Sequence, residues 1–329
     1  MIKEGAGRIG DRSGASRACE LMKKELRWVV LILAVAVPAV LNPDFRSYEN
    51  FQGFLQSIGI LLILSMGQSF VLLIAGIDLS VGAVLALCSV ILATLLQLGV
   101  PLTVATLLTV TVGLGVGVLN GALVLILKIP SFIVTFAMIG VAFSAALTLS
   151  GGNRIALPSS SPLPMLATSE FIGIPFQIIL ALVLLLIGSV GLRYLPTGRH
   201  LYAIGGNAEA ARLSGISIKA GTLLAFGVSS LFASIAGVIY TARIVSGNPI
   251  AGGNLNLQSI AAAVIGGVSL FGGKGTLAGA CFGAILYSVI ENVLTIYNVN
   301  PNVTEIIAGA IVILAGLMNV LTDAKGSRS

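Results

Sequence analysis

Charged side chains are scarce in this chain of 329 residues, where Asp, Glu, Lys and Arg together make up only 9%. Soluble globular domains carry about 25%, and a fold of this length with so few charges would leave too much apolar surface in water. The shortage excludes a soluble enzyme and a nucleic-acid-binding module, although the net charge is +6. With 57% hydrophobic residues and a mean hydropathy of +1.06, the chain is predicted to be an integral membrane protein.

Histidine and cysteine are also in short supply. The one histidine, His200, lies in a polar stretch, so neither a histidine-based metal site nor a histidine-dependent catalytic set is expected. Three cysteines cannot form a full set of disulfides. Cys88 and Cys281 lie in apolar runs, where they are predicted to be small buried side chains.

A phosphate-binding loop is missing as well. In the nearest approach, Gly272-Gly273-Lys274-Gly275, Val268 stands where the first glycine belongs and Gly275 stands where Ser or Thr would bind magnesium. We interpret this segment as a tight turn between two packed helices. The chain is therefore expected to hold no cofactor or metal, and any ATP-driven work would come from a partner.

Long apolar runs fill most of the chain. Because they are unbroken rather than alternating, helices are favoured over a β-barrel, and each crossing needs about 20 apolar residues. We predict an all-α, polytopic membrane domain at residues 28–321, between a basic N-terminal tail (1–27) and a C-terminal tail (322–329). About ten transmembrane helices are expected, at residues 28–42, 52–75, 81–98, 101–127, 130–150, 175–193, 219–243, 256–272, 275–297 and 303–321.

Basic residues predict the orientation of these spans. Seven Lys or Arg residues precede Trp28, which favours a cytoplasmic N-terminal tail. An even number of spans then places the C-terminal tail in the cytoplasm, together with the polar loop 194–218.

Two segments five spans apart are similar. Residues 75–80 (AGIDLS) precede the third span and residues 251–256 (AGGNLN) precede the eighth. An odd spacing inverts the second copy, which predicts a possible 5+5 inverted repeat of the kind found in many transporters. The alternative is that both segments are helix N-caps in a chain of low complexity.

The polar loop 194–218 contains the signals of a short helix. Asn207 is a good N-cap, Glu209 lies in the first turn where the helix dipole favours an anion, and Gly215 can end the helix. An apolar side is expected from Leu201, Ile204, Leu213 and Ile216.

A short, rigid helix between two spans is suited to dock into a groove of a soluble partner. An ordinary surface helix is the alternative. The predicted docking residues are Asn207, Ala208, Glu209, Ala210, Ala211, Arg212, Leu213, Ser214 and Gly215.

Charged residues near the spans suggest further roles, because ionisable groups in a membrane are costly. Arg243, Glu291 and Glu305 should all lie in the outer third of the membrane, where we hypothesise an ion-pair cluster that ties or gates the last helices. Asp78 lies at a span junction, and Ser80 beside it is expected to cap the following helix.

Three separated stretches carry a family resemblance. They are residues 66–87 (MGQSFVLLIAGIDLSVGAVLAL), 198–219 (GRHLYAIGGNAEAARLSGISIK) and 259–279 (SIAAAVIGGVSLFGGKGTLAG). In this order they resemble the permease subunits of ribose-, xylose- and galactose-type ABC sugar importers, over residues 50–321. One departure is Ala75-Gly76, where family members often carry an acidic residue before the Ile-Asp pair.

The resemblance implies a subunit that translocates a monosaccharide across the bacterial inner membrane and does not itself hydrolyse ATP. It implies three protein partners: a dimer of ATPase subunits that binds the ATP, a periplasmic sugar-binding protein, and a second copy or homologue of the permease. It further implies that residues 207–215 form the coupling helix, which transmits ATP-driven movement to the membrane domain.

The translocation path is expected among polar and aromatic residues of the spans, although each could instead bridge helices. Three other functions are the alternatives: an ABC permease for another small polar solute such as an amino acid, an ATP-independent secondary transporter or channel, and an intramembrane enzyme. A secondary transporter would need acidic residues in the middle of the membrane, and these are almost absent. An intramembrane enzyme would need a catalytic set, which the chain lacks. The candidate path residues are Asp78, Asn120, Phe136, Phe143, Asn254, Gln258 and Asn292.

Overall fold

The computed structural model describes residues 29, 31–300, 303, 304, 306, 307, 309, 310, 313 and 317. Over this part of the chain the fold is helical, apart from four two-residue strands. Among the described residues, six helices are long and apolar enough to cross a membrane. They are α2 (Tyr48–Leu73), α4 (Leu102–Leu127), α5 (Ser131–Ser150), α7 (Phe176–Tyr194), α10 (Ile218–Ile244) and α12 (Leu277–Ile296).

Shorter elements connect these helices. Three are apolar helices of 10–17 residues: Leu31–Leu41, α3 (Val81–Gln97) and α11 (Leu255–Ile265). The others are the 3₁₀ helix η1 (Asp44–Arg46) and the helices α6 (Leu163–Thr168), α8 (Pro196–Gly206) and α9 (Ala208–Leu213). Strand β1 (Ile155–Ala156) pairs with β4 (Ser246–Gly247), and β2 (Glu170–Phe171) pairs with β3 (Ile174–Pro175), both antiparallel.

Seven predicted spans coincide with helices to within four residues at each end. They are the spans at 52–75, 81–98, 101–127, 130–150, 175–193, 219–243 and 275–297. The all-α, polytopic prediction is confirmed, whereas the count of about ten spans is not. The segment predicted at 28–42 contains the helix Leu31–Leu41, which is short for a crossing. Most of the span predicted at 303–321 lies outside the described residues.

The span predicted at 256–272 is wrong. Helix α11 ends at Ile265 and a glycine-rich segment follows, here named the glycine loop (residues 266–276). Gly267, Gly272 and Gly273 have φ angles of 88°, 83° and 69°, which side chains other than glycine rarely adopt. The apolar residues within this loop therefore belong to a folded turn and not to a helix.

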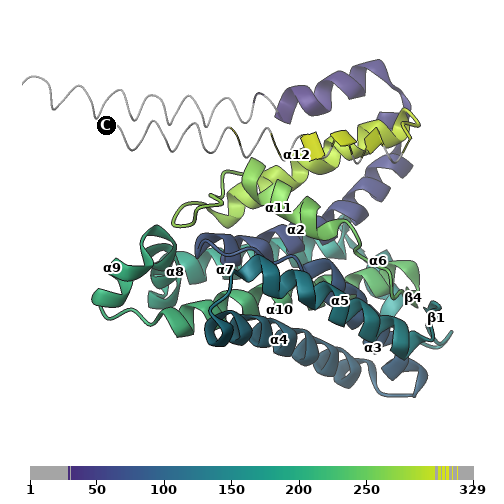
Figure 1. Ribbon diagram of the computed structural model, residues 1–329. Coiled ribbons are helices and arrows are strands. Elements are labelled where there is room, and N and C mark those ends of the chain that lie inside the picture. The colour runs from purple at the N-terminus through teal and green to yellow at the C-terminus, as the bar shows by residue number, and fades with distance from the viewer. Residues whose placement is uncertain are drawn as a thin grey trace, which may run out of the picture.

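Helices α2 and α10 form the centre of the bundle. Within an apolar stretch of 18 residues in each helix, the buried share is 83% in α2 and 72% in α10. The corresponding share is only 22% in α4 and 17% in α7. Helices α4 and α10 pack closely through glycines: a Cβ added at Gly117 would overlap the Phe226 carbonyl oxygen. Figure 1 shows α8 and α9 at one end of the bundle and β1 and β4 at the other.

The two similar segments meet in the structure. A Cβ added at Gly82, in the first turn of α3, would overlap the carbonyl oxygen of Gly252, just before α11. Gly252 itself has a φ of 76°, and a Cβ there would lie 2.6 Å from the Gly82 carbonyl oxygen. The beginnings of the two shorter apolar helices α3 and α11 are therefore in backbone contact.

Candidate functional site

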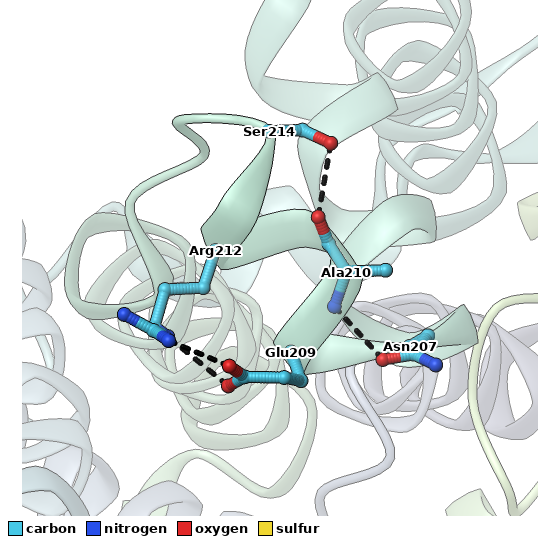
Figure 2. A network of polar contacts seen from close by, with 5 residues as sticks. All are labelled: Asn207, Glu209, Ala210, Arg212 and Ser214. Carbon is cyan, nitrogen blue, oxygen red and sulfur yellow. Dashed lines mark hydrogen bonds and ion pairs between the residues drawn. The ribbon is translucent and has the colours of Figure 1, made fainter.

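Helices α8 and α9 form a compact polar element between α7 and α10. Pro196 stands in the first turn of α8, where its missing N–H needs no partner. Helix α9 begins after Asn207, whose Oδ1 accepts a hydrogen bond of 2.9 Å from the Ala210 amide, as Figure 2 shows. It is followed by Gly215, which has a φ of 81°. The predicted N-cap and end of this helix are confirmed, whereas α8 was not predicted.

Helix α9 presents an ion pair to solvent. The Arg212 guanidinium donates from Nη2 to Glu209 Oε1 at 2.6 Å and from Nε to Oε2 at 3.0 Å (Figure 2). The two side chains are 62% and 67% exposed. The guanidinium lowers the pKa of Glu209, and the carboxylate raises the pKa of Arg212, so both groups stay charged at neutral pH.

The apolar side predicted for this element is divided between two settings. Leu201 and Ile204 of α8 are buried, and a Cβ added at Gly221 of α10 would overlap the end of the Ile204 side chain. Leu213 of α9, in contrast, is 75% exposed. Helix α8 is therefore the part that anchors the element, and α9 is the part that is open to solvent.

Helix α8 is anchored by backbone contact with two other segments. A Cβ added at Gly205 would overlap the Leu73 carbonyl oxygen at the end of α2 and lie 2.5 Å from the Gly273 amide nitrogen. That amide donates a hydrogen bond of 2.9 Å to the same Leu73 oxygen. The Tyr202 hydroxyl donates to the Gly275 carbonyl oxygen at 2.9 Å. Helix α8, the end of α2 and the glycine loop thus form one tight junction.

A second polar cluster surrounds Asp78, which is fully buried. Its Oδ1 accepts hydrogen bonds from the Ser80 amide (2.9 Å) and hydroxyl (2.6 Å), and its Oδ2 accepts one from the Ser229 hydroxyl of α10 (2.9 Å). Asn120 of α4 donates to the Ser80 hydroxyl oxygen at 2.9 Å. Ser80 does occupy the N-cap position of α3, but its side chain makes no capping bond because it donates to Asp78.

The structure disperses the predicted path residues. Asp78 and Asn120 belong to the buried cluster just described. Phe136 is 67% exposed on α5, and Phe143 is half-buried against the core. Asn254 is exposed at the N-cap of α11. These five residues therefore lie in different settings, from fully buried to exposed.

Gln258 of α11 and Asn292 of α12 line a common cavity of about 570 Å³, together with residues of α2 and α10. It lies at the end of the bundle opposite α8 and α9. Arg243 and Glu291 also line it, but within the described residues they form no ion pair, so that part of the predicted cluster is wrong. Glu305 lies outside the described residues.

Other kinds of site find no support in the described part of the chain. No group of three His, Cys, Asp or Glu residues there is placed to hold a metal ion. Cys88 and Cys281 are buried free thiols, as predicted. The polar side chains described above form three arrangements in this part of the chain: the exposed ion pair of α9, the Asp78 cluster and the lining of the cavity.

A family described as the permease component of a branched-chain amino acid transport system matches residues 50–316. The chain belongs to this permease family. The match includes α8 and α9, the glycine loop and all four helices of the cavity. No solved structure matches the permease.

Relatives of the permease cover it almost from end to end. The ribose import permease protein of Haemophilus influenzae is 33% identical over 294 residues, which are 88% of this chain and 91% of the relative. That of Bacillus subtilis is 34% identical over 308 residues (93% and 94%). The D-allose transport system permease protein of Escherichia coli is 36% identical over 289 residues (87% and 88%). The resemblance to permeases of ABC sugar importers is thereby confirmed, and the permease is a multi-pass transport subunit.

Proposed function

We propose that the permease carries a monosaccharide inward across the bacterial inner membrane as part of an ABC importer, and that α9 is its coupling helix. The observation that carries the proposal is the exposed Glu209–Arg212 pair on a helix of six residues that α8 anchors to the bundle. A charged, preordered surface of this kind suits docking to a soluble protein. The names of the ribose and D-allose relatives support a sugar as the solute.

The proposed partners follow from this assignment. A dimer of ATPase subunits binds ATP and contacts α9, and a periplasmic sugar-binding protein delivers the solute at the opposite face. A second permease, identical or homologous, completes the translocation path. The permease itself holds neither ATP nor a metal in this proposal.

We also propose the topology that the sequence predicts. Residues 28–321 form the membrane domain, and residues 1–27 and 322–329 lie in the cytoplasm on the side of the 194–218 loop. The excess of Lys and Arg before Trp28 supports this orientation. The meeting of Gly82 with Gly252 supports an inverted repeat that places the starts of α3 and α11 in contact.

The coupling role also rests on the junction of α8. Because Gly205 packs against both Leu73 and Gly273, a displacement of α8 has to move the end of α2 and the glycine loop with it. The glycine loop connects α11 to α12, which are two of the four walls of the cavity. Movement at α9 would thus reach the solute path through direct packing.

An amino acid is the second candidate solute, because the family description names branched-chain amino acid transport. Uptake of labelled ribose, D-allose and leucine into vesicles that hold the complete importer separates the two candidates. Sugar uptake that needs ATP is the expected result. Uptake that persists without ATP or without ATPase subunits would instead identify a secondary transporter or a channel.

A charge swap tests the coupling helix. The double substitution Glu209→Arg with Arg212→Glu keeps an ion pair at the same i,i+3 spacing, and because both side chains are exposed the reversed charges oppose the helix dipole only weakly, so α9 should persist. We expect normal membrane insertion and melting temperature, together with loss of ATP-driven uptake and of ATPase recovery in pull-downs. Leu213→Ala, which keeps both charges, shows how much the exposed leucine contributes. Full uptake by the double variant would remove α9 from the mechanism.

A further inference from the structure

We infer that the cavity between α2, α10, α11 and α12 is a binding site for a neutral, polyhydroxylated solute of monosaccharide size. This inference rests on the proposed function and deepens it by naming the site and the chemistry that recognises the solute. The volume of about 570 Å³ lies within the range of small-molecule sites. Its position at the end of the bundle opposite α9 is where a solute delivered from outside would enter.

The lining of the cavity is unusually polar for apolar helices. Of the fifteen lining residues, seven end in a neutral amide or hydroxyl, three are charged and five are apolar or glycine. Burying such groups in a bilayer is costly unless they find partners, so a lipid-filled crevice would not favour them. Amides and hydroxyls both donate and accept hydrogen bonds, as does every hydroxyl of a sugar. The lining therefore complements a solute that carries many hydroxyls.

Part of this lining is held in place before any solute binds. Asn50 and Asn292 exchange amide hydrogen bonds of 3.2 and 2.8 Å, which join the start of α2 to α12. Gln258 donates to Glu291 Oε1 at 3.4 Å. Asn292 still has a second N–H, and Gln258 still has a second N–H and its carbonyl oxygen, for a solute. Fixed groups with remaining bonding capacity are typical of a preorganised polar site.

An amino acid fits this lining less well. Arg243 and Glu291 could face its carboxylate and ammonium groups, and Phe54 and Leu61 could contact an apolar side chain. The apolar side chain of a leucine could not, however, use the remaining donors and acceptors of the amide and hydroxyl groups, such as the second N–H of Asn292 and of Gln258, whereas hydroxyls can. A sugar can use the same carboxylate and guanidinium as an acceptor and a donor.

Cysteine protection tests the site. Ser57 is exposed in α2 and lines the cavity, whereas Ser65 lies farther along α2, is fully buried and does not line it. Ser57→Cys and Ser65→Cys are compared in the complete importer in vesicles, with Cys19→Ser as background, because Cys88 and Cys281 are buried. The probe is a water-soluble maleimide, and the extent of labelling is read by mass spectrometry.

We expect labelling at position 57 to be at least tenfold faster than at position 65 and to slow severalfold in the presence of ribose or D-allose, but not of leucine. Equal, slow labelling at both positions would show that the cavity is closed to water and would overturn the site. Labelling that no solute slows, or that only leucine slows, would overturn the assignment to a polyhydroxylated solute.

A matched pair of substitutions gives an independent measurement. Gln258→Met keeps the side-chain length but removes the amide from the cavity. Gln97→Met makes the same change at an exposed residue outside it, which donates to the Ala156 carbonyl oxygen at 2.8 Å. We expect at least tenfold slower sugar uptake for Gln258→Met, with unchanged recovery of the ATPase subunits in pull-downs, and unchanged uptake for Gln97→Met. Equal uptake by both variants would overturn the role of Gln258.

The unsubstituted importer, measured in the same vesicles, separates this inference from the proposed function. ATP-driven sugar uptake without protection at position 57 would overturn the site and leave the proposed function standing. Absence of ATP-driven sugar uptake would overturn the proposed function and the sugar assignment together, whatever the labelling shows.

Discussion

The substitution Gly205→Ala tests the junction between α8, α2 and the glycine loop. The new methyl group would overlap the Leu73 carbonyl oxygen and lie 2.5 Å from the Gly273 nitrogen, and neither backbone atom can rotate away. Overpacking of this kind costs about 1–3 kcal/mol, and separation of the segments also breaks the 2.9 Å bond from Gly273 to Leu73, worth about 1 kcal/mol. The gain in helix propensity from Gly to Ala, about 1 kcal/mol, offsets only part of this.

The neighbouring glycine supplies the control. Gly206 ends α8, and a Cβ there meets nothing within 4 Å, so Gly206→Ala should be neutral or slightly stabilising. The assay compares the melting temperatures of the two purified variants and, in the complete importer, the ratio of solute carried to ATP hydrolysed. We expect Gly205→Ala alone to melt earlier and to hydrolyse ATP with less uptake. Equal melting and equal coupling in both variants would refute the description of this junction.

Three further hydroxyl deletions have defined outcomes. Ser229→Ala removes a donor to the buried Asp78 carboxylate and should lower the free energy of unfolding by about 1–3 kcal/mol in denaturant titrations. Ser230→Ala changes a buried hydroxyl without a partner and should be neutral or stabilising. A larger loss of stability for Ser230→Ala than for Ser229→Ala would contradict the Asp78 cluster. Tyr202→Phe removes the bond to the Gly275 carbonyl oxygen and should cost about 1 kcal/mol in the same titration, and an unchanged stability would show that this bond does not hold the glycine loop.

Helices bounded by local signals could be predicted from the sequence. The limits of α4 and α5 follow from apolar runs that begin after Pro101 and Pro130, because proline favours the start of a helix. Helix α9 is defined by an N-cap whose bonds span only three residues. In each case the information lies within one or two helical turns, so no knowledge of the rest of the fold is needed.

Features that depend on distant backbone could not be predicted in this way. Hydropathy favours a span across the glycine loop, whereas the positive φ angles of its glycines and its contacts with Leu73 and Gly205 end the helix. The cavity joins Asn50 to Asn292, which are 242 positions apart, and polar residues along a span do not reveal which of them will meet. The sequence indicates that Asp78 lies at a span junction beside the cap candidate Ser80, but it does not reveal that Ser229 on another helix also donates to Asp78.

Helices α2 and α12 are joined at both ends, by side-chain bonds at one end and by backbone contact at the other. At the cavity, two neutral amide bonds between Asn50 and Asn292 hold them, each worth about 0.5–1.5 kcal/mol. At the other end, Leu73, Gly205 and Gly273 are in backbone contact, where a small separation loses packing and hydrogen bonding together. Because side-chain amides can exchange partners by rotation whereas packed backbone segments cannot, we expect α12 to pivot about the glycine loop and to open at the Asn50–Asn292 pair. Such a pivot admits a solute at the cavity while α8 stays attached to the bundle, which coupling to α9 requires.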